Sequence, residues 1–166
     1  MFTEKNWEKR LTAKINDKFI SIIPYSGYSL SIADFTQPEF LLDPSISDGE
    51  LGRAVLESLK NSRFLELEKS YELEDICKEN YSKWVVNLME KYGYKTKKAL
   101  FKNMLSCSVR LEDGILVIRP SHHEKLEGWG GNDETERNKV YVPFDAPPAE
   151  IGAALRLAFS RCTTKF

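Results

Sequence analysis

The sequence predicts an α+β protein in which an antiparallel sheet made of hairpins packs against about four helices. Two observations carry this prediction. Apolar residues alternate with polar ones on both sides of turn signals, and elsewhere they recur at helical spacing between capping residues. Helices interspersed with antiparallel hairpins are typical of the α+β class. No linker or low-complexity segment divides the chain, so residues 1–166 are expected to form a single domain.

The first hairpin is expected at residues 11–23. A two-residue turn at Asn16-Asp17 would set Ala13 opposite Ile20, and this register gives the hairpin one apolar face.

A second hairpin, at residues 105–118, has a stronger signal. Asp113-Gly114 is the dipeptide favoured in a type I′ turn, and it sets Val109 opposite Ile118. Further short strands are expected at residues 140–142 and near residues 29–35.

Two helices are predicted to begin with the same pattern, Glu-aliphatic-Gly-x-Ala, at residues 50–54 and 150–154. Ser47 and Glu50 form a capping box at the first start, and Pro148 suits the first helical position at the second. The repeat therefore indicates two similar helix starts that pack against one core. Neither copy carries a nucleophile, a general base or a metal ligand, so any chemistry has to lie elsewhere.

The longest helix is predicted at residues 70–92, where apolar side chains recur every three or four positions and Gly93 supplies the end signal. A shorter helix is expected near residues 96–104.

The composition is that of a soluble globular protein, with 42% hydrophobic and 30% charged residues. A net charge of -1 predicts no general attraction to nucleic acid or to membranes. The first residues lack the apolar core of a signal peptide, and no apolar run is long enough to cross a membrane. Three cysteines without paired spacing, Cys77, Cys107 and Cys162, are read as reduced thiols of a cytosolic protein.

Although the net charge is small, acidic and basic residues are concentrated in different parts of the chain. Residues 30–79 contain twelve acidic and five basic side chains, whereas residues 80–110 contain one acidic and seven basic ones. Within the acidic part, the candidate partner-binding residues are Glu66, Glu68, Glu72, Glu74, Asp75 and Glu79. Three of them, Glu72, Glu74 and Asp75, are expected in the first turn of the long helix, where they would complement its dipole. The functional alternative is an anionic surface for a cationic partner, such as the active-site cleft of a nuclease.

The basic part interleaves tyrosines with Lys91, Lys95, Lys97, Lys98 and Lys102. This pattern is compatible with base stacking and phosphate contacts, which makes a small nucleic-acid-binding protein the alternative function. The other interpretation is a solvated turn between two helices, and the absence of a net positive charge favours it.

Two further segments could carry function. Trp129 lies in a glycine-rich stretch at residues 128–132, which we interpret as a mobile or partner-contacting surface loop with Trp129 as an exposed anchor. His122 and His123 are adjacent and lack a third metal ligand at a suitable spacing. We therefore interpret the histidines as structural residues after a strand that ends at Pro120, rather than as an enzyme's acid–base pair.

Four stretches together resemble a known family, and the last two are fairly specific when they occur together in this order. They are DGELGRAVLESLKNSR at residues 48–63, YSKWVVNLMEKYGYKTKKALFKNM at 81–104, SHHEKLEGWGG at 121–131 and PPAEIGAALRLAFSRC at 147–162. They resemble the immunity proteins of bacterial contact-dependent growth inhibition (CDI) systems. The resemblance spans most of the chain after about residue 45.

The resemblance implies a cytoplasmic protein that binds the C-terminal domain of a cognate CDI toxin and blocks its active site or its access to substrate. Such toxins are frequently nucleases, often acting on transfer RNA. The family has no catalytic residues to carry over. The expectation is therefore a binding protein without enzymatic activity, metal or cofactor, whose partner is a protein rather than a membrane or a nucleic acid.

Overall fold

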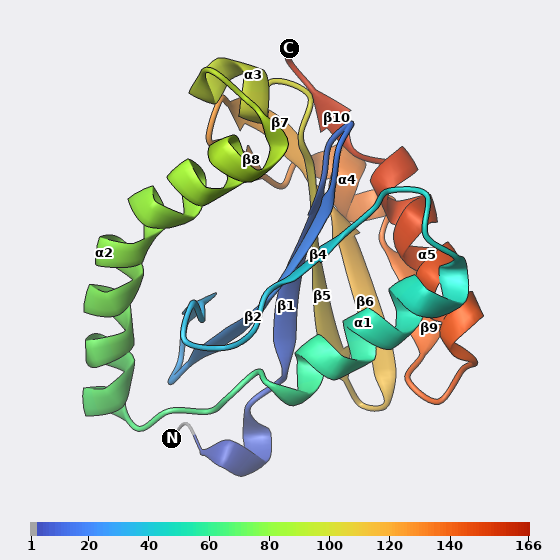
Figure 1. The fold of residues 1–166 in the computed structure, drawn as a ribbon. Coiled ribbons are helices and arrows are strands. Elements are labelled where there is room, and N and C mark those ends of the chain that lie inside the picture. Colours follow the sequence, from blue (N-terminus) through green and yellow to red (C-terminus); the bar gives the residue numbers. More distant parts are fainter. Residues whose placement is uncertain (1–2) are drawn as a thin grey trace.

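The computed structural model, which describes residues 3–166, is built around an antiparallel sheet whose two faces have different coverings (Figure 1). Its strands follow the order β3-β2-β1-β5-β6-β9, and β4 also pairs with β2. The strands are β1 (Arg10–Ile15), β2 (Ile20–Gly27), β3 (Ser31–Ala33), β4 (Phe40–Leu42), β5 (Leu105–Glu112), β6 (Ile115–Pro120) and β9 (Val140–Pro143). The predicted α+β class is confirmed.

One face of the sheet packs against α1 (Asp48–Lys60) and α5 (Pro148–Ser160), which lie side by side (Figure 1). Alternate residues of the strands, such as Leu11 and Ala13 on β1, are buried there together with the apolar faces of both helices. The two helices with the repeated start therefore share one core, as predicted. Ser47 caps α1 by accepting a hydrogen bond from the Glu50 amide at 3.1 Å.

The repeated glycines explain why the two helix starts have the same pattern. A Cβ atom on Gly52 would lie 1.8 Å from the carbonyl oxygen of Pro148, at the start of α5. A Cβ atom on Gly152 would lie 2.0 Å from the carbonyl oxygen of Asp48, at the start of α1. Each glycine thus lets the other helix's first residue approach its backbone, which is why the pattern occurs in both helices.

The long helix α2 (Leu67–Tyr92) stands over the other face of the sheet, and Gly93 ends it in the left-handed conformation, as predicted (Figure 1). A short helix, α3 (Lys97–Phe101), follows after the turn at residues 93–96. The C-terminal half of α2 contributes Trp84, Val85 and Leu88 to a second buried cluster with β2 and α3. Because α2 begins three residues earlier than expected, Glu72, Glu74 and Asp75 lie beyond its first turn, and their predicted helix-dipole role was wrong.

The second hairpin has the predicted register, with Val109 opposite Ile118. The first hairpin does not, because Ala13 pairs with Ile22 rather than Ile20. The Asn16 side chain accepts hydrogen bonds from the amides of Lys18 and Phe19, at 3.0 and 3.2 Å, and so builds a longer turn. The shift is two residues, so every side chain keeps its predicted face.

Residues 121–138 are more ordered than the sequence indicated. The predicted surface loop forms β8 (Gly128–Gly130), which pairs with β7 (His122–Lys125), and β7 in turn pairs in parallel with β10 (Thr163–Thr164). A short helix, α4 (Asp133–Arg137), follows and is capped by reciprocal hydrogen bonds between Asn132 and Thr135. The chain also has a 3-10 turn at Glu4–Asn6.

Candidate functional site

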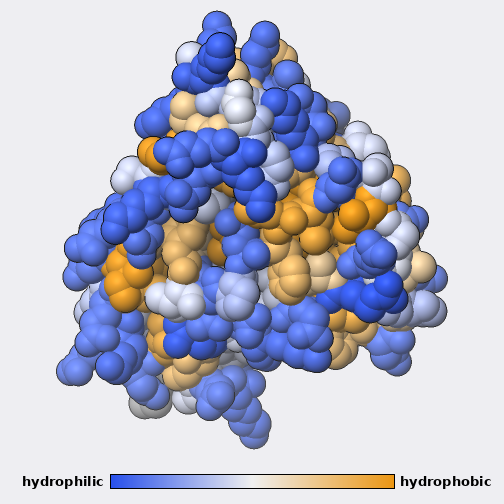
Figure 2. Space-filling model, viewed as in Figure 1, coloured by the Kyte–Doolittle hydropathy of each residue, from blue (hydrophilic) through white to orange (hydrophobic). Residues whose placement is uncertain are grey.

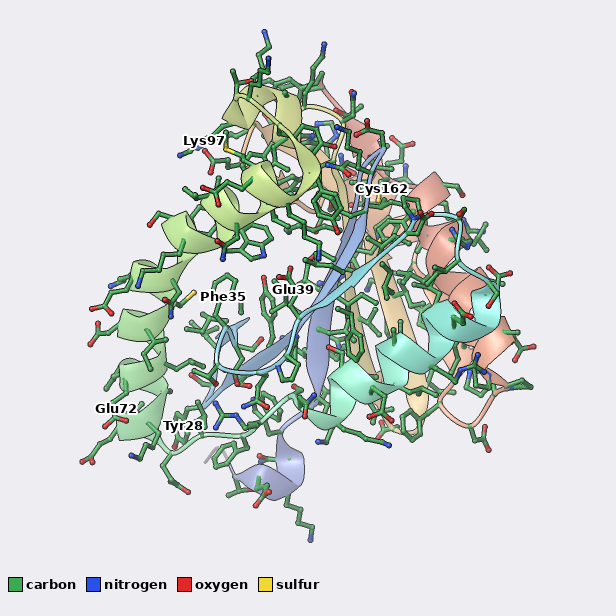
Figure 3. All side chains as sticks on the ribbon, viewed as in Figure 1. Tyr28, Phe35, Glu39, Glu72, Lys97 and Cys162 are labelled. Carbon is green, nitrogen blue, oxygen red and sulfur yellow. The ribbon has the colours of Figure 1, made fainter. Side chains whose placement is uncertain are left out.

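A cleft of about 580 Å³ lies between α2 and the face of the sheet that α1 and α5 leave uncovered. Its floor consists of residues that alternate along the strands with the core residues, so they point away from the main core. They are mostly hydroxyl-bearing or cationic: Thr12, Lys14, Ser21, Tyr25, Ser106, Ser108 and Arg119. Its walls are largely apolar and include Phe35, Tyr81, Trp84 and Trp129. Figure 3 shows Phe35 and Glu39 in the space between α2 and the sheet.

Lys14 is the most unusual residue of the cleft floor. Lys14 is half-buried and borders the cleft. Nζ donates a hydrogen bond to Ser106 Oγ at 3.1 Å and lies 4.4 Å from the centre of the Trp129 ring. Burial lowers the pKa of Lys14 to about 8, because partial removal from water disfavours the charged form.

Two carboxylates connect α2 to the rest of the cleft. Glu39 accepts hydrogen bonds from Ser21 Oγ at 2.5 Å and from the Trp84 indole N–H at 2.8 Å, and burial raises its pKa. Glu127 accepts from the Tyr81 hydroxyl at 2.8 Å, and Lys97 lies 3.9 Å from its other oxygen. Burial and the neighbouring Glu127 raise the pKa of Tyr81. Both acids are therefore engaged with their own donors.

Trp129 is not the exposed loop anchor that was predicted. It is half-buried on β8, its indole N–H donates to the Met104 carbonyl at 2.9 Å, and its ring stacks on His123 at 4.6 Å between centroids. The histidines are strand residues, since both lie on β7. His122 Nδ1 lies 2.7 Å from Thr163 Oγ1, and a ring nitrogen of His123 lies 2.9 Å from the Leu126 carbonyl. Each histidine thus has a structural partner.

The six predicted acidic residues are all exposed, at the start and along the first half of α2. Successive residues of an α-helix are rotated by 100° about its axis, so one side of α2 carries four of these acids: Glu68, Glu72, Asp75 and Glu79. We call these four residues the acidic stripe. The buried residues Leu73, Trp84 and Leu88 lie on the opposite side. Glu66 is the N-cap residue, and Glu74 borders a separate hollow that shares Cys77 and Tyr81 with the cleft. Figure 2 shows a mostly hydrophilic surface over the outer edge of α2, and Figure 3 labels Glu72 there.

The basic stretch does not present its tyrosines for stacking. Tyr92 stacks on Phe19 with 4.6 Å between centroids, and the Tyr94 hydroxyl donates to Asp17 at 2.6 Å. Both rings are half-buried, whereas the five lysines are exposed. This arrangement matches a solvated turn between two helices.

The structure also brings together two cysteines that are 55 positions apart. The sulfur atoms of Cys107 and Cys162 lie 3.6 Å from each other, and both are free thiols. Within residues 3–166, no group of three His, Cys, Asp or Glu side chains is placed to hold a metal ion. Over the same residues, none of the helices has the length and apolar character needed to cross a membrane.

Comparison with known proteins places this arrangement in a family. Residues 9–162 match the CdiI family of CDI immunity proteins. The chain belongs to the CDI immunity protein family. It is 40% identical over 165 residues to the immunity protein CdiI-YPIII of Yersinia pseudotuberculosis serotype O:3, a match that covers 91% of this chain and 93% of that protein.

Two solved structures resemble this CDI immunity protein over nearly its whole length. A protein of unknown function from Neisseria meningitidis has a TM-score of 0.87 and 36% sequence identity, covering 98% of this chain and 99% of that one. A chain of the CdiA-CT/CdiI toxin and immunity complex from Yersinia pseudotuberculosis has a TM-score of 0.82 and 35% identity, covering 95% and 98%. The predicted family is therefore confirmed.

The sequence predicted the acidic residues but missed the cleft. Its floor comes from β1, β2, β5 and β6, and no stretch of the chain contains more than a few of its residues. The sequence signal that could have indicated the cleft was the alternation of polar and core residues along the strands. Thr12 and Lys14 on β1, like Ser106 and Ser108 on β5, are polar positions between core residues, and on an outer sheet face such positions are simply expected to meet water.

Proposed function

We propose that this protein binds the C-terminal domain of its cognate CDI toxin and neutralises the toxin by stoichiometric occlusion, without a catalytic step of its own. The observation that carries the proposal is the family match over residues 9–162, supported by the likeness to a chain from a toxin and immunity complex. We place its action in the cytoplasm, where a delivered toxin would meet its substrate.

We further propose that the toxin is a nuclease, acting on an RNA such as transfer RNA, and that the acidic stripe contacts its active-site cleft. A nuclease cleft accepts phosphates and therefore has a positive potential, which attracts carboxylates. The stripe supports this proposal because its four carboxylates lie on the outer side of α2, and among the residues described only Glu72 has an ion-pair partner, Lys69 at 3.3 Å.

The test is a binding isotherm of the purified protein with its cognate toxin domain. The double variant Asp75→Lys/Glu79→Lys is expected to bind about tenfold or more weakly, because two attractive charges become repulsive. The matched control is Glu57→Lys/Asp145→Lys, which makes the same charge change at exposed positions on α1 and before α5. The control is expected to bind within about twofold of the unmodified protein.

Equal affinities of the stripe variant and the control for the toxin domain would show that the interface does not include the acidic stripe. No binding of the unmodified protein to the cognate toxin would overturn the proposed function itself.

A further inference from the structure

We infer that Cys107 and Cys162 are an oxidisable thiol pair, which hydrogen peroxide converts into a disulfide that fastens the C-terminal end of the chain to the central sheet. The pair belongs to the core on the side of the sheet that α1 and α5 cover, opposite the cleft. This chemistry goes beyond the proposed function, and its test needs no toxin.

The first argument is the position of the two sulfur atoms. Cys107 Sγ and Cys162 Sγ lie 3.6 Å apart, although the residues are 55 positions apart in the sequence. A bond between them needs an approach of roughly 1.5 Å, because an S–S bond is about 2.05 Å long. The backbone of Cys107 is fixed between β1 and β6, whereas Cys162 follows the end of α5, where Figure 3 labels it. Cys162 is therefore the residue that makes the approach.

The second argument is that the two thiols differ in access and in acidity. Cys107 has no exposed surface, whereas Cys162 is half-buried and within reach of a small oxidant. A hydrogen bond donated by the Cys107 thiol to the Cys162 sulfur lowers the pKa of Cys162. The same contact, together with burial, raises the pKa of Cys107. Because the thiolate is the nucleophile, Cys162 reacts with the oxidant first, and Cys107 follows.

The oxidation has two steps. The Cys162 thiolate attacks one oxygen of hydrogen peroxide, so an S–O bond forms and the O–O bond breaks. The departing hydroxide takes up the proton that Cys162 released and leaves as water. The Cys107 sulfur then attacks the sulfur of this sulfenic acid, so the S–S bond forms, the S–O bond breaks, and a second water leaves with the Cys107 proton. Two thiols thus lose two electrons, and one peroxide is reduced to two waters.

The disulfide strengthens the attachment of the last segment of the chain. In the reduced protein, β10 is held by hydrogen bonds from the Thr163 amide to the Ser121 carbonyl at 3.0 Å and from the Lys165 amide to the His123 carbonyl at 3.1 Å. A bond at Cys162 adds a covalent link immediately before this strand. It also closes a loop of 55 residues, which restricts the unfolded chain. The oxidised protein is therefore more stable than the reduced one.

The test treats the purified, fully reduced chain with hydrogen peroxide, alkylates the remaining thiols in denaturant and identifies them by mass spectrometry. We expect Cys107 and Cys162 to be lost together and to appear in one cross-linked peptide, while Cys77 is still alkylated. The melting temperature is expected to rise by about 5 °C or more after oxidation, and dithiothreitol should reverse this rise.

Cys77 provides the matched control, because it is also half-buried but lies on α2, outside the pair. Cys77→Ser should form the cross-link as the unmodified protein does, whereas Cys162→Ser should show neither the cross-link nor the rise in melting temperature. Cys107→Ala should accumulate a sulfenic acid on Cys162, which dimedone traps. Each variant is compared with itself before and after peroxide, so a variant that is less stable from the outset still gives a result.

Three results would overturn the inference. Cys162 oxidised to a sulfinic acid without a cross-link to Cys107, or left unreacted, would show that the two sulfur atoms do not meet. Equal rates of loss for Cys77 and Cys162 would show that the contact with Cys107 confers no reactivity. A cross-linked protein whose melting temperature is unchanged or lower would show that the bond strains the fold instead of fastening it. All three leave the proposed toxin binding untouched.

Discussion

Asp34 is a buried charged residue, whereas Lys14 is half-buried at the floor of the cleft, and the two side chains have different partners. The Asp34 side chain has no exposed surface, and its carboxylate accepts hydrogen bonds from Ser26, Thr36 and Arg63, with Arg63 Nη2 at 2.8 Å. Such a saturated carboxylate is a structural residue. Among the residues described, Lys14 contacts only the Ser106 hydroxyl and the face of the Trp129 ring.

At the residue scale, we predict that Asp34→Ala lowers the free energy of unfolding by about 2–4 kcal/mol, because the Ser26 hydroxyl and the Arg63 guanidinium lose their acceptor. In a chain of 166 residues this corresponds to a fall in melting temperature of roughly 4–16 °C, measurable by circular dichroism. Asp145→Ala, at an exposed position, is the control. A fall below about 2 °C for Asp34→Ala would show that the network contributes little.

At the scale of elements, α2 is attached to the sheet at both of its ends. Before its start, Arg63 binds Asp34, and the backbone of Gly27 exchanges hydrogen bonds with Arg63 and Leu65. Near its end, Trp84 binds Glu39, and Lys18 Nζ donates to the Tyr92 carbonyl at 2.8 Å. The helix therefore spans the cleft between two attachments, with its acidic stripe on the outside.

The close approach of α1 and α5 gives the sharpest prediction for an element. Gly52→Ala or Gly152→Ala should lower the free energy of unfolding by about 3 kcal/mol or more. The new methyl group would overlap a backbone carbonyl of the facing helix, and a backbone group cannot move aside by changing rotamer as a side chain can. Thermal melting measures the effect.

Gly49→Ala is the matched control on α1. Its Cβ would have Arg53 side-chain nitrogens as nearest neighbours, at 3.7 and 3.8 Å, which is ordinary contact. Alanine in a helix is favoured over glycine by about 0.5–1 kcal/mol, so this variant should be as stable as the unmodified protein or more so. Equal melting temperatures for Gly49→Ala and Gly52→Ala would contradict the close-approach explanation.

At the scale of the whole molecule, the sheet separates a core from a cleft, and local patterns predicted the first much better than the second. The Asp113-Gly114 turn, Gly93 and the repeated helix starts each depend on neighbours in the sequence, so the second hairpin and the main helices were predicted correctly. The register of the first hairpin differs from the prediction because the Asn16 side chain accepts hydrogen bonds from the backbone of a longer turn. The small sheet of β7, β8 and β10 is too short to show an alternating pattern.

The candidate site likewise has one part that the sequence could predict and one that it could not. The acidic stripe follows from helical periodicity within one element and was within reach of the sequence. The environment of Lys14 was not, because Ser106 is 92 residues away and Trp129 lies further still along the chain. Only the pairing of β1 with β5 and the position of β8 bring these groups together.

The central claim, that this protein neutralises its cognate toxin by binding it, is tested most directly by the growth of cells that produce the toxin domain inside the cell. Co-production of this chain should restore growth to the rate of cells without toxin, and co-production of an unrelated CDI immunity protein should not. Failure of this chain to restore growth, although both proteins are present and folded, would contradict the claim.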